Sequence, residues 1–84
     1  MKTETTATFI VMNQEYVYEY YNTNVIRKGT RMRVGPRPTG SGFLQEDGFV
    51  LIIGHGADVL IPRDRFDIED VVTETVTTTR HIRR

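Results

Sequence analysis

GFVLIIGHGADVLI, the stretch Gly48–Ile61, decides the fold class. Its apolar run Phe49–Ile53 is typical of a strand buried on both faces, and it predicts the centre of the core. Glycines at both ends of Gly54–Gly56 supply the positive φ that a tight turn requires, so the chain returns as a second strand over Ala57–Ile61. Pro62 ends that strand because it has no N–H for a ladder. The stretch therefore predicts a β-hairpin.

The rest of the chain carries the same β signal. Segments rich in Thr, Val, Ile and aromatic residues, which suit a pleated surface, predict further strands at Thr3–Met12, Glu15–Tyr21, Val25–Ile26 and Arg31–Val34. Gly35–Gly42 (GPRPTGSG) has no periodicity and predicts an exposed loop. Pro62–Phe66 predicts one turn of tight helix.

Val71–Thr79 (VVTETVTTT) has two interpretations. Ile68, Val72 and Val76 stand at helical spacing, which favours a helix. Val and Thr make up eight of the nine residues, however, and their branched side chains are crowded in a helix. We predict one strand here and leave the helix open. The Thr-rich segments Thr3–Met12 and Val71–Thr79 are expected to pair, with each other or with a second copy, which leaves a homodimer open.

These elements add up to about five to six antiparallel strands in 84 residues. That length fits one domain, because a split would leave neither half a core. We predict a single all-β barrel or sandwich over residues 1–84, with residues 80–84 as a basic C-terminal tail.

Three segments resemble a known family: Ile26–Val34 (IRKGTRMRV), Gly48–Gly54 (GFVLIIG) and Ala57–Ile61. Together, within residues 26–61, they resemble the SH3-like small β-barrel of KOW-type domains, with a turn glycine before an alternating strand. The resemblance implies an SH3-like barrel that contacts RNA, DNA or ribosome-associated proteins. Two features depart from the family: Thr30 stands where an acidic residue is usual, and the loop is rich in proline instead of lysine.

The charges cancel overall but are segregated along the chain. Eleven basic and eleven acidic residues leave no global field that would draw the chain to a polyanion or a lipid surface. No acidic residue occurs in Tyr20–Gln45, whereas Glu46–Glu74 holds eight carboxylates. Separated faces of opposite sign favour a binding protein.

The residues needed for catalysis are scarce. The chain has no cysteine, one serine (Ser41, in the predicted loop) and two histidines, so we expect no enzyme, no metal and no cofactor. His55, at a predicted hairpin tip, is read as a solvated turn residue, with ligand contact as the alternative. No apolar run approaches the 20 or so residues of a membrane span, and we expect a cytoplasmic protein.

A run of cations forms the candidate site. If Arg31 and Arg33 project from one strand face, then with Arg27, Lys28 and Arg37 they form a ridge about 20 Å long at roughly 3.3 Å per residue. Such a ridge can track phosphates or meet an acidic patch on a protein.

The tyrosines of Glu15–Tyr21 also have two interpretations. Tyr16, Tyr18 and Tyr20 share one strand face, as part of the core or as an exposed interface. We favour the core because Val17 is the sole apolar residue opposite them.

The sequence thus predicts a small non-enzymatic binding module, a protein-binding inhibitor or adaptor acting on a larger partner. The alternative is a nucleic-acid-binding small barrel that uses the arginine-rich strand and loop. No membrane partner is expected.

Overall fold

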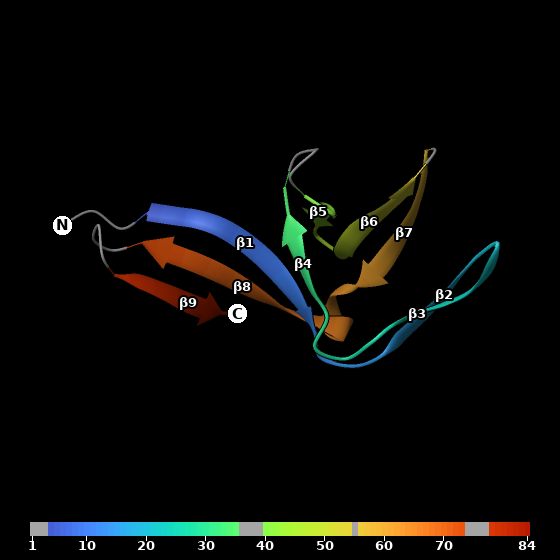
Figure 1. The fold of residues 1–84 in the computed structure, drawn as a ribbon, viewed down its shortest axis with the longest axis horizontal. Helices are drawn as coiled ribbons and strands as arrows, with labels where there is room; N and C mark the ends of the chain where they lie inside the picture. Colours follow the sequence, from blue (N-terminus) through green and yellow to red (C-terminus); the bar gives the residue numbers. More distant parts are fainter. Residues whose placement is uncertain (1–3, 36–39, 55, 74–77) are drawn as a thin grey trace.

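The computed structural model describes residues 4–35, 40–54, 56–73 and 78–84. Over these residues the chain is all-β, as predicted, with one 3₁₀ turn (Figure 1). The elements are β1 (Glu4–Met12), β2 (Tyr16–Tyr20), β3 (Asn22–Ile26), β4 (Arg31–Val34), β5 (Gly42–Gln45), β6 (Gly48–Gly54), β7 (Ala57–Pro62), η1 (Arg63–Arg65), β8 (Phe66–Thr73) and β9 (Thr79–Arg83). The tight helical turn predicted after Pro62 is confirmed as η1.

Two sheets organise the strands. Seven strands form one sheet in the order β7-β6-β5-β4-β1-β8-β9, while β2 and β3 form a hairpin of their own. All pairings are antiparallel except β4 with β5, which run parallel where Val34 lies opposite Gly42. The predicted hairpin Gly48–Ile61 is β6 and β7, paired in register from Gly48↔Pro62.

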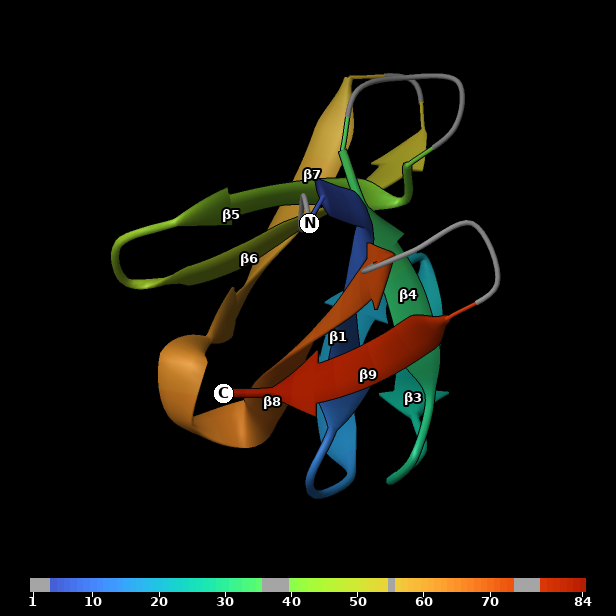
Figure 2. The ribbon, with the colours of Figure 1, turned by 90° about the vertical axis from the view of Figure 1, so that its left-hand side faces the viewer.

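The prediction of a small barrel or sandwich of about five to six antiparallel strands is right in its all-β class and wrong in its strand number and in any closed barrel. Among the described residues the sheet is open, with β7 and β9 at its edges, and it has more strands than predicted. Closing this sheet would need β7 to pair with β9, which lies beside β8 (Figure 2), and the described residues show no such pairing.

The edge strand β9 lies in the segment predicted as a basic tail, residues 80–84. Thr79–Arg83 forms β9, with Arg83 opposite Glu69 on β8. The N–H of Arg84 donates to the carbonyl of Ile68 at 2.6 Å, and the N–H of Ile68 donates to the carbonyl of Arg84 at 2.7 Å. The tail prediction is therefore wrong, because Thr79–Arg83 pairs with β8, whose Glu69 and Asp70 accept from Arg83 and Arg84.

Two further element predictions need correction. The segment Val71–Thr79 is not one strand: Val71–Thr73 ends β8, Thr79 begins β9, and residues 74–77 lie outside the described residues. β5 begins at Gly42, inside the predicted loop, and was missed. Pairing of the N-terminal strand with β8 is confirmed, with Glu4 opposite Thr73 and Ala7 opposite Val71.

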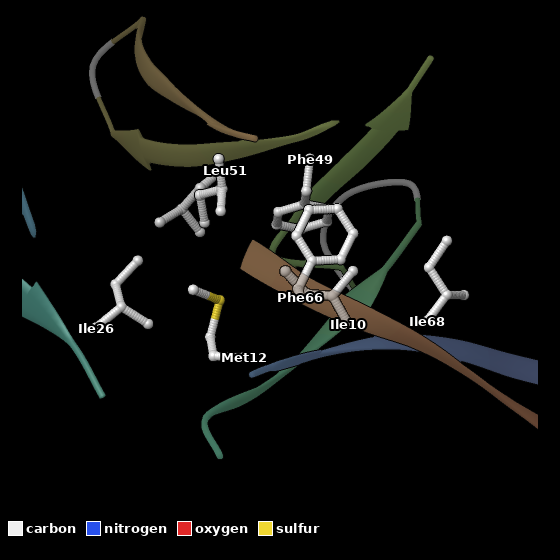
Figure 3. Packing of buried hydrophobic residues seen from close by; sticks show 8 residues of the cluster. Ile10, Met12, Ile26, Phe49, Leu51, Phe66 and Ile68 are labelled. Atoms are coloured by element: carbon white, nitrogen blue, oxygen red, sulfur yellow. The ribbon is translucent and has the colours of Figure 1, made fainter. Parts of the chain in front are cut away.

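The core lies where the sheet folds over on itself. Ile10 and Ile68, from β1 and β8, lie in one buried cluster with Phe49 and Leu51 of β6 (Figure 3). The rings of Phe49 and Phe66 meet edge to face, with centroids 6.3 Å apart. Phe49 is fully buried, which confirms the run Phe49–Ile53 as a core segment.

The hairpin β2–β3 packs on this core through one face. Tyr16 and Tyr18 contact the core cluster, and the hydroxyl of Tyr16 donates to the carbonyl of Leu60 at 3.3 Å. On the opposite face Val17 is 49% exposed and lies opposite Val25, which is 50% exposed. The prediction that the tyrosine face points inward is thus confirmed for Tyr16 and Tyr18.

The molecule is elongated, with extents of 49 × 25 × 21 Å and a radius of gyration of 14.1 Å. A compact chain of this length has a radius of gyration near ~12 Å. The β2–β3 hairpin reaches one end of the long axis, and β1, β8 and β9 reach the other (Figure 1). Within the described residues, no helix has the length and apolar character needed to cross a bilayer.

Candidate functional site

The predicted ridge begins in the turn between β3 and β4. The carbonyl of Arg27 accepts from the N–H of Thr30 at 3.1 Å, which closes a β-turn. Gly29 has φ +88°, the left-handed conformation that a type II turn requires at this position. Its N–H donates to the carbonyl of Met12 at 2.7 Å, which fixes the turn to β1. Arg27 and Lys28 are exposed on this turn.

The ridge continues along β4, where Arg31 and Arg33 are exposed and alternate with half-buried Met32 and Val34. This confirms the predicted faces of the strand. Arg37, the fifth predicted site residue, lies outside the described residues.

Phe9 of β1 lies beside both arginines. It is opposite Arg33 in the register of β1 and β4. The guanidinium carbon of Arg31 stands 3.8 Å from the ring centroid of Phe9, and that of Arg33 stands 6.0 Å away. Both distances suit cation–π attraction, so the aromatic ring holds the two cations over the outer face of the sheet.

Arg31 also forms an ion pair with Glu69 of β8. Because β1 lies between β4 and β8, the Arg31 side chain must cross one strand to make this contact. The Glu69 side chain is 10% exposed and that of Arg31 is 42% exposed. An unpaired buried carboxylate costs more free energy than one paired with a part-exposed arginine, so Glu69 needs its basic partners to stay charged at this position.

Two residues of β9 complete the shell around Glu69. Arg83 donates to Oε2 at 3.3 Å, and His81 Nδ1 lies 3.4 Å from Oε1. Burial alone would raise the pKa of Glu69, but the hydrogen bonds from Arg31, His81 and Arg83 outweigh it and hold that pKa below its usual range. Glu69 is therefore ionised and shared among three basic side chains. We call Arg31, Glu69, His81 and Arg83 the Glu69 cluster.

A second ion pair lies on the opposite face of β8. Asp70 accepts from the Thr8 hydroxyl at 2.7 Å and from Nε of Arg84 at 2.8 Å. These hydrogen bonds, first from Arg84 and then from Thr8, hold the pKa of Asp70 below its usual range. The Arg83–Glu69 pair and the Arg84–Asp70 pair attach β9 and the residue after it to β8 on both faces of the sheet.

Sequence reasoning missed Phe9, Glu69, His81 and Arg83. The sequence carried one signal of this face. In β8 the charged Asp67 and Glu69 alternate with the apolar Phe66 and Ile68, as in a strand with one buried and one polar face. The spacing does not reveal which strand lies next to an alternating charged segment, and that neighbour decides whether Glu69 is solvated or buried.

The other candidates from the sequence are spread out. His55 lies outside the described residues, although Gly54 and Gly56 have φ +111° and +80° and confirm the predicted turn. In the described part of the chain, no three His, Asp or Glu side chains are grouped so that they could hold a metal ion.

Comparison with family models, with curated proteins and with solved structures finds no significant match to this chain.

Proposed function

We propose that this chain is a non-enzymatic protein-binding module that contacts its partner through the outer face of β4, β1 and β8. The observation that carries the proposal is the alternation of charge across this face. Arg31 and Arg33 stand on β4, Asp67 and Glu69 on β8, and Arg83 on β9, with Phe9 between the two signs.

Alternating charge favours a protein over a nucleic acid. A phosphate backbone is bound by a run of cations, each of which neutralises a phosphate. Arg31 is already neutralised by Glu69, and Arg83 lies within 3.9 Å of Asp67 as well as donating to Glu69. A polyanion that extends from Arg33 across β8 would meet carboxylates.

A protein surface can match such a face point by point, because single acidic and basic side chains are placed independently. Arg27, Lys28 and Arg33 are the exposed cations for an acidic patch, and Phe9 offers part of its ring for apolar contact. Rim charges of this kind mainly accelerate association and select the partner.

An inhibitor or adaptor role fits the rest of the chain. The N–H of Ser41 donates to the carbonyl of Arg33 on β4, whereas His81 lies on β9, three strands further along the sheet. The sole serine and the Glu69–His81 pair therefore do not converge as a nucleophile and base would. A module without such chemistry acts by occupying or bridging a larger partner.

The rival function is nucleic-acid binding through the Arg27–Lys28 turn, as the KOW-like resemblance over residues 26–61 implies. That turn is exposed and leads into the start of β4. Arg31, the first residue of β4, pairs with Val11, and Val11 pairs with Asp67 on its other side, so the turn lies next to a carboxylate. Nucleic acid would thus be limited to a short contact at the turn.

Affinity capture from lysate, with and without nuclease, tests the proposal. The chain should retain a protein after nuclease treatment, and Arg33→Glu should lose it. Arg80→Glu, the same charge change on the opposite face of β9, is the matched control and should retain it. Capture that disappears with nuclease supports the rival function, and equal capture by Arg33→Glu contradicts the proposed face.

A further inference from the structure

A row of three apolar side chains crosses the adjacent strands β5, β6 and β7 (Figure 1). Phe43 lies opposite Val50, and Val50 lies opposite Leu60. Their strand neighbours Phe49 and Ile61 belong to the core cluster. Because side chains alternate along a strand, the row lies on the face that turns away from the core. We call Phe43, Val50 and Leu60 the Leu60 row.

The Leu60 row forms an apolar surface that is separate from the core. Phe43 is 45% exposed and Leu60 is 39% exposed, whereas Val50 between them is buried although it is not a member of the core cluster. The Leu60 side chain extends over β6, since a Cβ atom placed on Gly48 would lie 3.2 Å from its Cδ1. Two large apolar side chains thus flank a covered valine, and contiguous apolar surface of this kind is typical of binding sites.

Carboxylates flank the Leu60 row at both ends along the strand direction. Asp58 shares the face of Leu60, two residues before it in β7. Glu46 and Asp47 form the turn at the opposite end, between β5 and β6. All three carboxylates are exposed. The acidic ends are separated by about 17 Å at roughly 3.3 Å per residue, with the apolar row between them.

These carboxylates are not neutralised by the chain itself. The sequence from Gly40 to Pro62 has no lysine or arginine. The ion pairs within the described residues involve other carboxylates. Arg63, the next cation along the chain, donates to the carbonyl of Phe66 at 2.7 Å and is therefore directed toward β8. The face is apolar in the middle and negative at both ends.

We propose that this face binds an extended segment of a partner protein in which one large apolar side chain stands between two basic ones at two-residue spacing. The apolar side chain covers Phe43 and Leu60, and the basic side chains pair with Asp58 at one end and Glu46 at the other. In an extended segment these basic residues are about 13 Å apart at roughly 3.3 Å per residue, and their long side chains reach the remaining distance. Polyanions are repelled by the same carboxylates.

The proposal goes beyond the function proposed above, because the Leu60 row and its carboxylates have no residue in common with the face around Arg33. The two surfaces also differ in sign: exposed cations stand on the turn before β4 and on β4 itself, and exposed carboxylates stand around β5, β6 and β7. A chain with two such surfaces can hold two different partner segments, as an adaptor does.

A tryptophan peptide tests the proposal, because the chain itself contains no tryptophan. The probe is the acetylated and amidated peptide TKTWTKT, whose emission should shift to the blue when the full chain is added and should saturate. Binding should weaken as salt rises. Asp58→Lys with Glu46→Lys, and separately Leu60→Thr, should each weaken it about tenfold or more. Glu15→Lys, an exposed acid before β2, is the matched control and should bind like the wild type.

Two further peptides separate the contributions of charge and apolar contact. TETWTET, with the opposite charge, should not bind, and TKTSTKT, without the apolar side chain, should not displace the probe. Phe43→Thr, at an exposed position, replaces Leu60→Thr if that variant has a lowered melting temperature.

The proposal is overturned by absence of a shift with TKTWTKT, by equal binding of TETWTET, or by variants that bind like the wild type. Sedimentation velocity adds one more outcome: self-association of the wild-type chain that Asp58→Lys abolishes would make a second copy the occupant and would also overturn it. The lysate capture by Arg33→Glu tests the other face separately, so failure of one proposal leaves the other standing.

Discussion

Arg31 reaches across strand β1 to the carboxylate of Glu69 on β8, so this single ion pair spans three strands. On its way the guanidinium stacks on Phe9, with 3.8 Å between its carbon and the ring centroid. The arginine is thereby both neutralised and fixed. It belongs to the framework of the outer face, whereas Arg33, further along β4, remains the better placed to contact a partner.

Glu69→Gln should lower the free energy of unfolding by about 1–3 kcal/mol, because Arg31 and Arg83 would lose a charged acceptor in a mostly buried position. Urea denaturation followed by circular dichroism measures the change. Glu46→Gln, in an exposed turn, is the control and should stay near the wild type. Equal stability of Glu69→Gln and the wild type would show that the cluster adds nothing to folding.

The stability of the chain should fall in acid through Glu69 and Asp70. Both folded-state pKa values lie below the ordinary values of 4.5 and 3.8, so folding favours the ionised carboxylates. Their contribution is therefore complete above those values and is lost as the pH falls through the lowered pKa values. Urea titrations at stepped pH should show a flat free energy of unfolding above about pH 5 and a decline below it. In Glu69→Gln the decline should be shallower, and an unchanged slope would exclude Glu69 as a source.

Gly56→Val should destabilise the chain by about 1–3 kcal/mol, since a branched residue at φ +80° is strained. His55→Ala, in the same turn, should leave the melting temperature and partner binding unchanged if the turn needs backbone freedom and no imidazole. Thermal unfolding and the capture assay measure both variants. Loss of capture in His55→Ala at an unchanged melting temperature would make His55 a binding residue.

Tyr21→Asn should raise the free energy of unfolding by about 0.5–1 kcal/mol. Tyr21 has φ +62° at the tip of β2–β3 and its side chain is 92% exposed, with an edge contact to Tyr20 at a centroid distance of 4.6 Å. Asn tolerates the left-handed conformation better than an aromatic residue does. Chemical denaturation measures the difference, with Tyr21→Phe as the control at wild-type stability. A destabilised Tyr21→Asn would mean that the tyrosine contact outweighs the backbone strain.

The sequence predicted those parts of the fold that local residue preferences determine. The apolar run Phe49–Ile53, the glycines around His55 and the alternation of Arg31 to Val34 all predicted their elements correctly, because burial and turn geometry depend on residue type at fixed spacing. The tyrosine face could be assigned for the same reason.

The remaining features depend on which strands become neighbours. β9 consists of TRHIR, in which only Thr79 and Ile82 favour a strand and the other three residues are basic, and it is ordered through Glu69 and Asp70 on β8. Arg31 was predicted as part of the cationic ridge, and its ion pair with Glu69 was missed because that acceptor lies 38 residues away along the chain and two strands away in the sheet. Such pairings arise from topology, and one sequence without an alignment carries no direct record of them.

Binding of a protein to the outer face is tested by the association rate of the captured protein with the wild-type chain and with Arg33→Glu. Surface plasmon resonance at stepped salt, with and without random-sequence RNA or DNA as competitor, provides it. We expect Arg33→Glu to slow association while dissociation changes little, and we expect nucleic acid not to compete. Competition by nucleic acid at physiological salt, together with tight salt-dependent binding of that RNA or DNA that Arg33→Glu abolishes, would exclude a protein as the main partner of this face and favour the nucleic-acid function.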